Sequence, residues 1–141
     1  MMDWVIDASI ALAWALPDET SDQADRFLSR VSAEEILWVP ALWWYEVANA
    51  LVVVERRKRL TEAEGIRLIE LYGMLPIKTD TVIGPGILER LRTLAREYKL
   101  SAYDSAYLEL TLRKGLGLAT LDKELRSAGE KAGVKKIWGQ T

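Results

Sequence analysis

The 141-residue sequence contains no cysteine and no histidine, and these two absences exclude several kinds of chemistry. Without cysteine there can be no disulfide, no thiol nucleophile and no cysteine-ligated zinc. Without histidine there can be no serine–histidine triad and no imidazole acid–base catalysis. Any catalysis must therefore use carboxylates, lysines, tyrosines, hydroxyls or a metal held by oxygen ligands.

Targeting signals and long apolar runs are also missing. The first ten residues, MMDWVIDASI, lack the basic and apolar regions of a secretory signal. No apolar stretch reaches the roughly 18 residues of a membrane span, so we expect a cytoplasmic protein with no membrane partner. The formal net charge of -2 at pH 7 argues against a uniformly basic nucleic-acid binder. It does not exclude one, because local basic patches matter more than the sum.

Short apolar segments alternate with helical ones along the chain. We predict buried strands at 4–7 and 36–40, a short strand or edge segment at 76–80, and further strands at 115–120 and 134–138. Between them we predict helices at 9–16 (stopping at Pro17), 21–31, 41–59, 61–75, 83–98, 101–114 and 123–131. This alternation predicts an α/β sandwich, with a mainly parallel central sheet covered by helices on both faces. Since no repeat or linker is visible, residues 1–141 are expected to form one domain.

Four carboxylates stand out by their positions. Asp7 and Asp122 follow predicted strands, where open parallel sheets bind ligands, although each also precedes a helix and could be its N-cap. Glu46 lies in the segment ALWWYEVANALVVV, a helix that is apolar on nearly all sides and is therefore expected to be buried. Asp104 lies inside a predicted helix, and alone it is better explained as a hydrogen-bonded aspartate than as a ligand.

Convergence of these carboxylates on one cleft would require a partner of opposite charge. Two like charges about 4 Å apart repel by roughly 4 kcal/mol at an effective dielectric near 20. The net stability of a domain is only roughly 5–15 kcal/mol. Either some of the carboxylates stay protonated or a divalent cation neutralises them. Oxygen ligands without imidazole or thiolate favour Mg²⁺ or Mn²⁺ over zinc or copper.

Four short motifs follow one another in a specific order. They are Asp-x-Ser (Asp7, Ser9), Glu-x-x-Asn (Glu46, Asn49), Asp-x-x-Tyr (Asp104, Tyr107) and Thr-x-Asp (Thr120, Asp122). Over essentially its whole length the sequence resembles the PIN-domain nucleases, in particular the VapC-type toxins of toxin–antitoxin pairs. The resemblance implies a PIN-like fold and an acidic quartet that binds Mg²⁺ or Mn²⁺, formed by Asp7, Glu46, Asp104 and Asp122. It also implies three supporting polar residues, Ser9, Asn49 and Thr120.

The same resemblance implies an activity and partners. It implies a metal-dependent endoribonuclease that acts on RNA, often transfer or ribosomal RNA, and that works as a homodimer held in check by a small antitoxin. Two alternatives are a non-cleaving PIN-like RNA-binding module and a housekeeping RNA-processing nuclease. A phosphatase or nucleotide-binding domain is less well supported, because no Gly-rich phosphate loop follows any strand. Glu124 could add a fifth acid or could simply face solvent.

Basic residues and tryptophans indicate further surfaces. Candidates for phosphate contacts are the run at 56–59, the arginines at 90, 92 and 96, and the pair at 113 and 114, although charges on helices usually just face water. Trp43 and Trp44 are neighbours on one helix and point about 100° apart, so they cannot both fill the same core face. Together with the apolar helix around them, they favour a buried partner surface.

Overall fold

The computed structural model describes residues 2–16, 21–31 and 34–138. Its centre is a five-stranded parallel sheet in the order β3-β2-β1-β4-β5. The strands are β1 (Trp4–Ile6), β2 (Leu37–Pro40), β3 (Ile77–Asp80), β4 (Gly117–Ala119) and β5 (Ile137–Trp138). The helices within these residues are α1 (Ala8–Ala15), α2 (Asp22–Arg30), α3 (Ala41–Arg56), α4 (Glu62–Met74), α5 (Pro85–Tyr98), α6 (Ala102–Lys114) and α7 (Lys123–Lys131).

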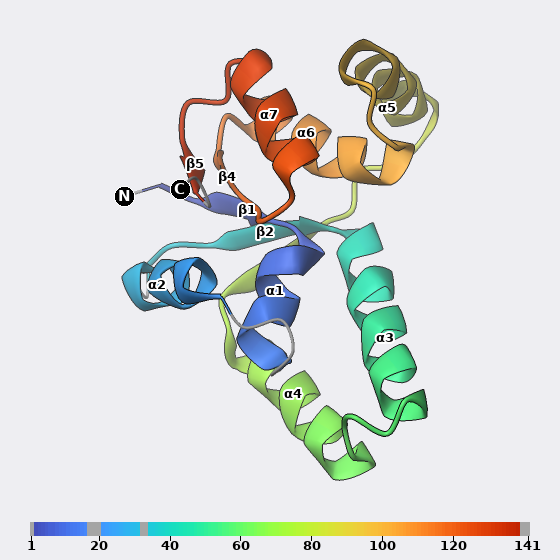
Figure 1. Ribbon diagram of the computed structural model, residues 1–141. Coiled ribbons are helices and arrows are strands. Elements are labelled where there is room, and N and C mark those ends of the chain that lie inside the picture. The colour runs from blue at the N-terminus through green and yellow to red at the C-terminus, as the bar shows by residue number, and fades with distance from the viewer. Residues whose placement is uncertain (1, 17–20, 32–33, 139–141) are drawn as a thin grey trace.

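Helices cover both faces of the sheet. In Figure 1, α1, α3 and α4 lie below the strands, whereas α5, α6 and α7 lie above them. The chain first moves outward from β1 to β2 and β3, and then returns across the sheet to place β4 on the other side of β1. This reversal creates a switch point between β1 and β4, which is where open α/β sheets bind ligands. The predicted α/β sandwich with a parallel sheet is confirmed.

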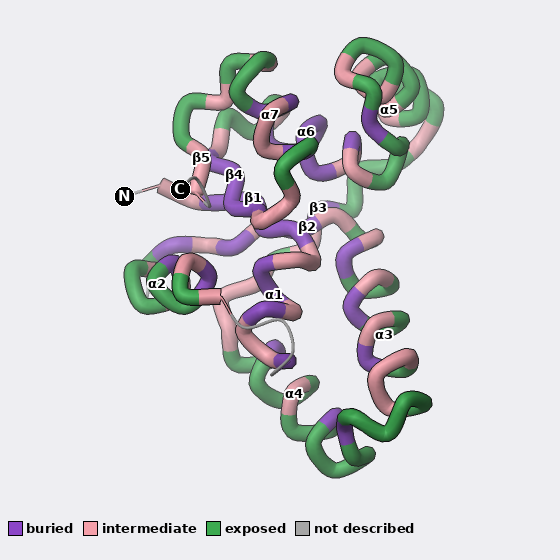
Figure 2. Tube along the Cα trace, in the orientation of Figure 1, coloured by how far each residue is buried: buried purple, intermediate pink, exposed green. Residues whose placement is uncertain are grey.

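The core lies where the short central strands meet the helices on either side. All three residues of β1 and of β4 are buried. Figure 2 shows the buried segments concentrated on the strands and on the inward sides of α1, α3 and α6, whereas α5 lies at the periphery. No residue of α5 is buried. Burial on both faces explains why these strands read as continuous apolar runs rather than as alternating patterns.

Element boundaries differ from the prediction by a few residues, each for a local reason. Helix α3 ends at Arg56 rather than at residue 59, because Lys58 takes a left-handed conformation with φ of 59°. Helix α5 begins at Pro85 rather than at residue 83, because Gly84 has φ of 142° and proline suits the first helical position. The predicted stop at Pro17 lies outside the described residues. None of the described helices has the length and apolar character needed to span a bilayer.

The expectation that α3 is buried nearly all round is wrong. Only Trp43, Val47 and Leu51 are buried, and they form one stripe at four-residue spacing. On the other sides the helix faces outward, so that Tyr45 is 75% exposed. Trp43 is fully buried whereas Trp44 is 40% exposed, which confirms that the two rings do not share a core face.

Candidate active site

Asp7 lies at the carboxyl end of β1 and is the N-cap of α1. Its Oδ1 accepts hydrogen bonds from Ser9 Oγ at 2.6 Å and from the Ile10 amide at 3.3 Å, and its Oδ2 accepts one from Thr120 Oγ1 at 2.5 Å. Burial raises the pKa of Asp7 from 3.8 to about 6, and the charge of Asp122 adds to the rise, although the hydrogen bonds oppose it. The fold therefore holds this carboxyl group in a place where its charge is poorly compensated.

Asp122 lies at the matching position after β4 and caps α7. Its Oδ1 accepts from the Leu125 amide at 2.9 Å, and its own amide donates to Thr120 Oγ1 at 2.9 Å. Across the switch point, Ser9 Oγ accepts from the Leu121 amide at 3.0 Å. Asp7 and Asp122 are therefore both helix caps, and hydrogen bonds through Ser9 and Thr120 connect the strand ends that carry them. Ser9 and Thr120, predicted as supporting residues, link the two strand ends.

Glu46 reaches the same edge of the sheet from α3. It is half-buried, and its Oε1 accepts a hydrogen bond from the hydroxyl of Tyr107 on α6. Burial, followed by the hydrogen bond to Glu46, raises the pKa of Tyr107 well above its usual range, so that the phenol keeps its proton. Asn49 is exposed on α3 and makes no hydrogen bond among the described residues. The structure therefore joins Glu46 to α6 but does not join Asn49 to the other predicted residues.

Asp104 lies in the first turn of α6, not in the helix interior as its sequence context suggested. Its backbone amide is capped by Ser101 Oγ at 3.0 Å, and its side chain is half-buried. Partial burial raises the pKa of Asp104, and the negative charges of Asp122, Glu46 and Glu124 raise it further. The charge of Asp122 therefore acts on both Asp7 and Asp104, and the charge of Glu46 acts on Asp104. Glu124 is exposed in the first turn of α7 and adds a weaker influence.

The four carboxylates have the right ligand atoms for a hard divalent cation, but they are too far apart to form a metal site as they stand. Across residues 2–16, 21–31 and 34–138, no three acidic side chains are close enough to form a preformed metal site. Burial is the main cause of the raised pKa values of Asp7 and Asp104, and neighbouring negative charges raise both further. Four carboxylates from four elements supply only oxygen ligands, which suit Mg²⁺ or Mn²⁺. Binding such a cation would require the carboxylates to move closer together.

An ion cluster beside the site was missed in the sequence. Arg113 on α6 contacts Asp80 at the end of β3 at 2.7 Å and Glu109 on its own helix at 2.9 Å. Both carboxylates are buried. Arg113 is therefore a structural cation, and its prediction as a phosphate contact is not supported. The i,i+4 spacing of Glu109 and Arg113 was visible in the sequence, but nothing there indicated that Asp80 would join them.

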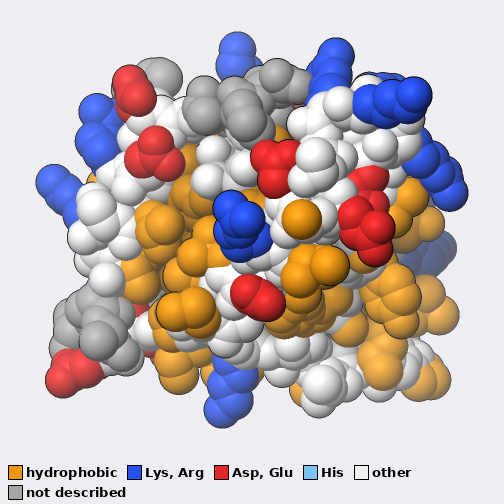
Figure 3. Space-filling view, turned by 90° about the horizontal axis from the view of Figure 1, so that it is seen from below, with side chains coloured by type: hydrophobic (Ala, Val, Ile, Leu, Met, Phe, Trp, Pro, Cys, Tyr) orange, Lys and Arg blue, Asp and Glu red, His pale blue; other side chains and the backbone are white. Residues whose placement is uncertain are grey.

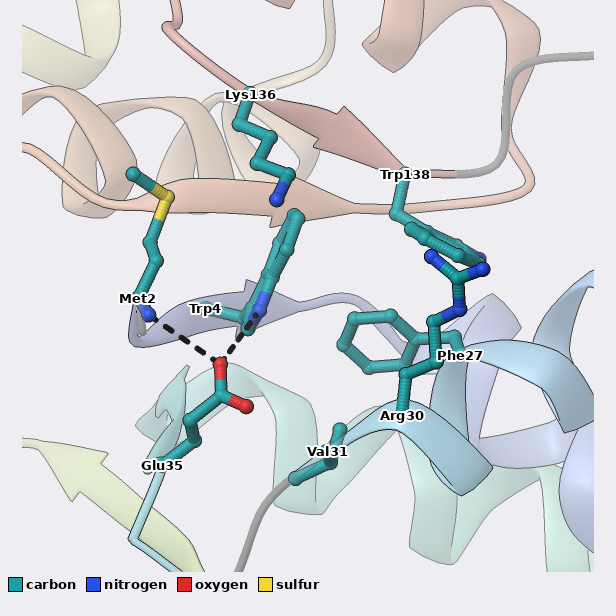
Figure 4. Close-up of a pocket in the computed structure, with 8 residues that line it drawn as sticks. All are labelled: Met2, Trp4, Phe27, Arg30, Val31, Glu35, Lys136 and Trp138. Atoms are coloured by element: carbon teal, nitrogen blue, oxygen red, sulfur yellow. Dashed lines mark hydrogen bonds between the residues drawn. The ribbon is translucent and has the colours of Figure 1, made fainter.

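Other candidate features lie away from the carboxylates. The basic run at 56–59 is at the far end of α3, roughly 15 Å along the helix from Glu46 at 1.5 Å per residue. A cavity of about 410 Å³ opens beside the amino end of β1 (Figure 4), and it contains none of the four carboxylates. There Glu35 accepts hydrogen bonds from the Trp4 indole and from the Met2 amide. Within the described residues, this cavity and the basic run are therefore separate from the four carboxylates.

Comparison with known proteins agrees with this architecture. Residues 4–131 match the PIN domain family. The chain therefore belongs to the PIN-domain family, a class of nucleases. It is also 33% identical to ribonuclease VapC3 of Pyrobaculum aerophilum over 128 residues, which cover 88% of this chain and 92% of that protein. This degree of identity and coverage places it among the VapC ribonucleases, as the sequence motifs predicted.

Solved structures support the fold. The crystal structure of PAE2754 from Pyrobaculum aerophilum is similar with a TM-score of 0.68 and 28% identity, covering 96% of this chain and 83% of that one. A toxin–antitoxin complex from Klebsiella pneumoniae contains a chain with a TM-score of 0.61, covering 96% of this chain and 95% of that one. Its identity is 19%, so the second likeness concerns the fold alone.

Proposed function

We propose that this protein is a metal-dependent endoribonuclease that hydrolyses RNA phosphodiester bonds, and that it is the toxin of a type II toxin–antitoxin pair. The observation that carries the proposal is the electrostatic linkage of Asp7, Glu46, Asp104 and Asp122, in which Asp122 acts on Asp7 and on Asp104, and Glu46 acts on Asp104. Each comes from a different segment, and the first and third have raised pKa values. Membership of the VapC ribonucleases supports the same reaction.

In this proposal the four carboxylates hold Mg²⁺ or Mn²⁺. When bound, such a cation supplies a water of lowered pKa and polarises a phosphoryl oxygen, so no imidazole base is needed. Ser9 and Thr120 keep both oxygens of Asp7 in place through their hydroxyl hydrogen bonds. Asn49 stays a proposed supporting residue, on the exposed side of α3. With the cation bound, water would form a new bond to phosphorus while one ester P–O bond breaks, giving a phosphate monoester and a free hydroxyl; the 2′-hydroxyl need not take part.

A non-cleaving RNA-binding module accounts for these residues less well. Burying the Asp7 carboxylate is unfavourable, and a neighbouring aspartate makes it more so. A module that only binds RNA would gain nothing from this arrangement, because RNA phosphates repel carboxylates. A cation that bridges carboxylate and phosphate removes both conflicts. The same argument favours a nuclease, but it does not distinguish a toxin from a housekeeping enzyme. Similarity to the VapC ribonucleases supports the toxin.

We further propose that the toxin is a homodimer and binds a small antitoxin in the cytoplasm. Two groups of exposed apolar side chains support two protein contacts. One lies around α5 and includes Val82, Ile83 and Leu88; the other lies on α4 and includes Ile69 and Met74. Figure 3, which views the molecule from below, shows hydrophobic side chains over much of the face on the α4 side. Exposed apolar patches of this kind mark protein interaction sites.

The test is cleavage of a mixed transfer and ribosomal RNA pool by the purified protein with Mg²⁺, Mn²⁺ or EDTA. Asp104→Asn is the test variant. Asp25→Asn, an exposed aspartate on α2, is the matched control. We expect discrete fragments with either metal, none with EDTA and none with Asp104→Asn, whereas Asp25→Asn cleaves normally. Cleavage that persists in EDTA and in Asp104→Asn would contradict the proposed site, and absence of cleavage by folded wild-type protein would favour the binding module.

A further inference from the structure

Tyr107 is a buried tyrosine whose hydroxyl points at the proposed site. The residue is 1% exposed and lies on α6, one turn after Asp104. Its ring belongs to the hydrophobic core, whereas its hydroxyl donates a hydrogen bond to Glu46 Oε1 on α3. The bond joins two helices on opposite sides of the sheet, at the edge where the carboxylates meet.

Glu46 depends on this contact more than Asp7 depends on any single partner. Asp7 has three hydrogen-bond donors, and Asp122 is fixed as the cap of α7. The only hydrogen bond or ion pair of the Glu46 side chain within the described residues is the one from Tyr107. A glutamate has three rotatable side-chain bonds, so a half-buried one without a partner would sample several positions. The phenol therefore selects the position from which Glu46 faces the cleft.

We infer that Tyr107 is a positioning residue, which fixes the Glu46 carboxylate through its Oε1 so that Glu46 could serve as a ligand of the divalent cation. This inference rests on the proposed function. Hydrogen-bond donors behind a metal-ligating carboxylate orient it, and their removal typically weakens metal binding or activity by about 10–100-fold. A hydroxyl suits this task because it occupies one oxygen without bringing a positive charge that would compete with the cation.

A second buried tyrosine provides a matched control. Tyr72 on α4 is 3% exposed, and its hydroxyl donates to the Ala11 carbonyl at 2.9 Å, which is not part of the acidic cleft. Tyr72→Phe and Tyr107→Phe each remove one buried hydroxyl and leave the ring. If Tyr107 matters only for packing, the two variants should behave alike. If it positions Glu46, only Tyr107→Phe should change metal binding.

The experiment measures Mn²⁺ affinity by electron paramagnetic resonance for the wild type and for Tyr107→Phe, Tyr72→Phe, Glu46→Gln and the Tyr107→Phe/Glu46→Gln double variant. We expect Tyr107→Phe to weaken Mn²⁺ binding about 10–100-fold and Tyr72→Phe to change it less than about twofold. The double variant should bind as weakly as Glu46→Gln alone, because the hydroxyl acts through that carboxylate. RNA cleavage should lose kcat in Tyr107→Phe with little change in KM.

Each other result overturns the inference. Equal Mn²⁺ affinities for Tyr107→Phe and Tyr72→Phe would show a packing role only, with the proposed function intact. Additive losses in the double variant would show that Tyr107 does not act through Glu46. A wild-type protein that binds no Mn²⁺ would overturn the proposed function as well. Tyr107→Met, which also fills the site with an apolar side chain, takes the place of Tyr107→Phe if the latter does not fold.

Discussion

Asn in place of Asp7 should make the metal-free protein more stable at neutral pH while it abolishes RNA cleavage. The reason is the carboxylate's burial, which raises its pKa from 3.8 to about 6. Above pH 6 the folded protein must keep a poorly solvated charge, whereas the unfolded chain keeps the same charge in water. The neutral amide of Asp7→Asn removes this penalty and keeps a polar group beside the hydroxyls of Ser9 and Thr120.

The magnitude follows from the pKa difference. Each pKa unit corresponds to about 1.4 kcal/mol, so the charged form of Asp7 lowers the free energy of unfolding by about 3 kcal/mol at pH 7.5. Because the folded state binds a proton more readily than the unfolded state between pH 4 and 6, the wild type gains stability from this group as the pH falls. Between pH 7.5 and pH 5 the gain should be roughly 1–2 kcal/mol.

Urea unfolding in EDTA at pH 7.5 and at pH 5 measures this difference. The advantage of Asp7→Asn over the wild type should be largest at pH 7.5 and should shrink by roughly 1–2 kcal/mol at pH 5. Asp25→Asn, which replaces an exposed aspartate, should change the free energy of unfolding by the same amount at pH 7.5 and at pH 5. If the difference in free energy of unfolding between Asp7→Asn and the wild type is the same at both pH values, the reasoning is refuted. That result would mean that burial does not destabilise the charged form of Asp7.

Three further predictions concern the scaffold, and urea unfolding measures each of them. Arg113→Ala should lower the free energy of unfolding by about 3–5 kcal/mol, because it leaves the buried Asp80 without an ion pair and leaves the buried Glu109 only its 3.8 Å contact with Arg90. Arg92→Ala, in an exposed pair, should change it by less than about 1 kcal/mol. Equal losses of stability in Arg113→Ala and Arg92→Ala would contradict the burial of the carboxylates that Arg113 contacts. Trp43→Ala should destabilise by about 3–5 kcal/mol and its neighbour Trp44→Ala by much less; the reverse order would mean that α3 is rotated. Thr61 and Glu64 form a capping box at the start of α4, in which the side chain of each accepts a hydrogen bond from the backbone amide of the other. Thr61→Ala should therefore lower the free energy of unfolding by about 1 kcal/mol, and an unchanged urea midpoint would refute that role.

Much of the fold followed from local patterns in the sequence. The apolar runs of β1 and β4 indicated strands buried on both faces, and the motif of Thr61 and Glu64 marked the start of α4. The burial of α3 could not be predicted, because a helix of this composition can pack either against its own chain or against a partner protein. The sequence shows that α3 is rich in apolar residues, but it does not show that Tyr45 faces solvent.

The sequence predicts four carboxylates for the candidate site, but it does not predict the contacts that these residues make. Strand ends at a switch point account for Asp7 and Asp122, since parallel strands bring their carboxyl ends to one edge. The hydrogen bond between Tyr107 and Glu46 joins residues 61 positions apart, and no local pattern predicts which helix faces pair across the sheet. Asn49 shows the converse: its spacing from Glu46 suggested a shared site, but the helix turns it toward solvent.

The central claim is that Asp7, Glu46, Asp104 and Asp122 hold one divalent-cation site, and anomalous diffraction from crystals soaked in Mn²⁺ tests it most directly. The account predicts an anomalous peak in the cleft between the ends of β1 and β4, with oxygens of these carboxylates as its ligands. It also predicts that the peak disappears in crystals of Asp7→Asn. A cleft without a peak in the wild type, or manganese bound only elsewhere on the protein, would contradict it.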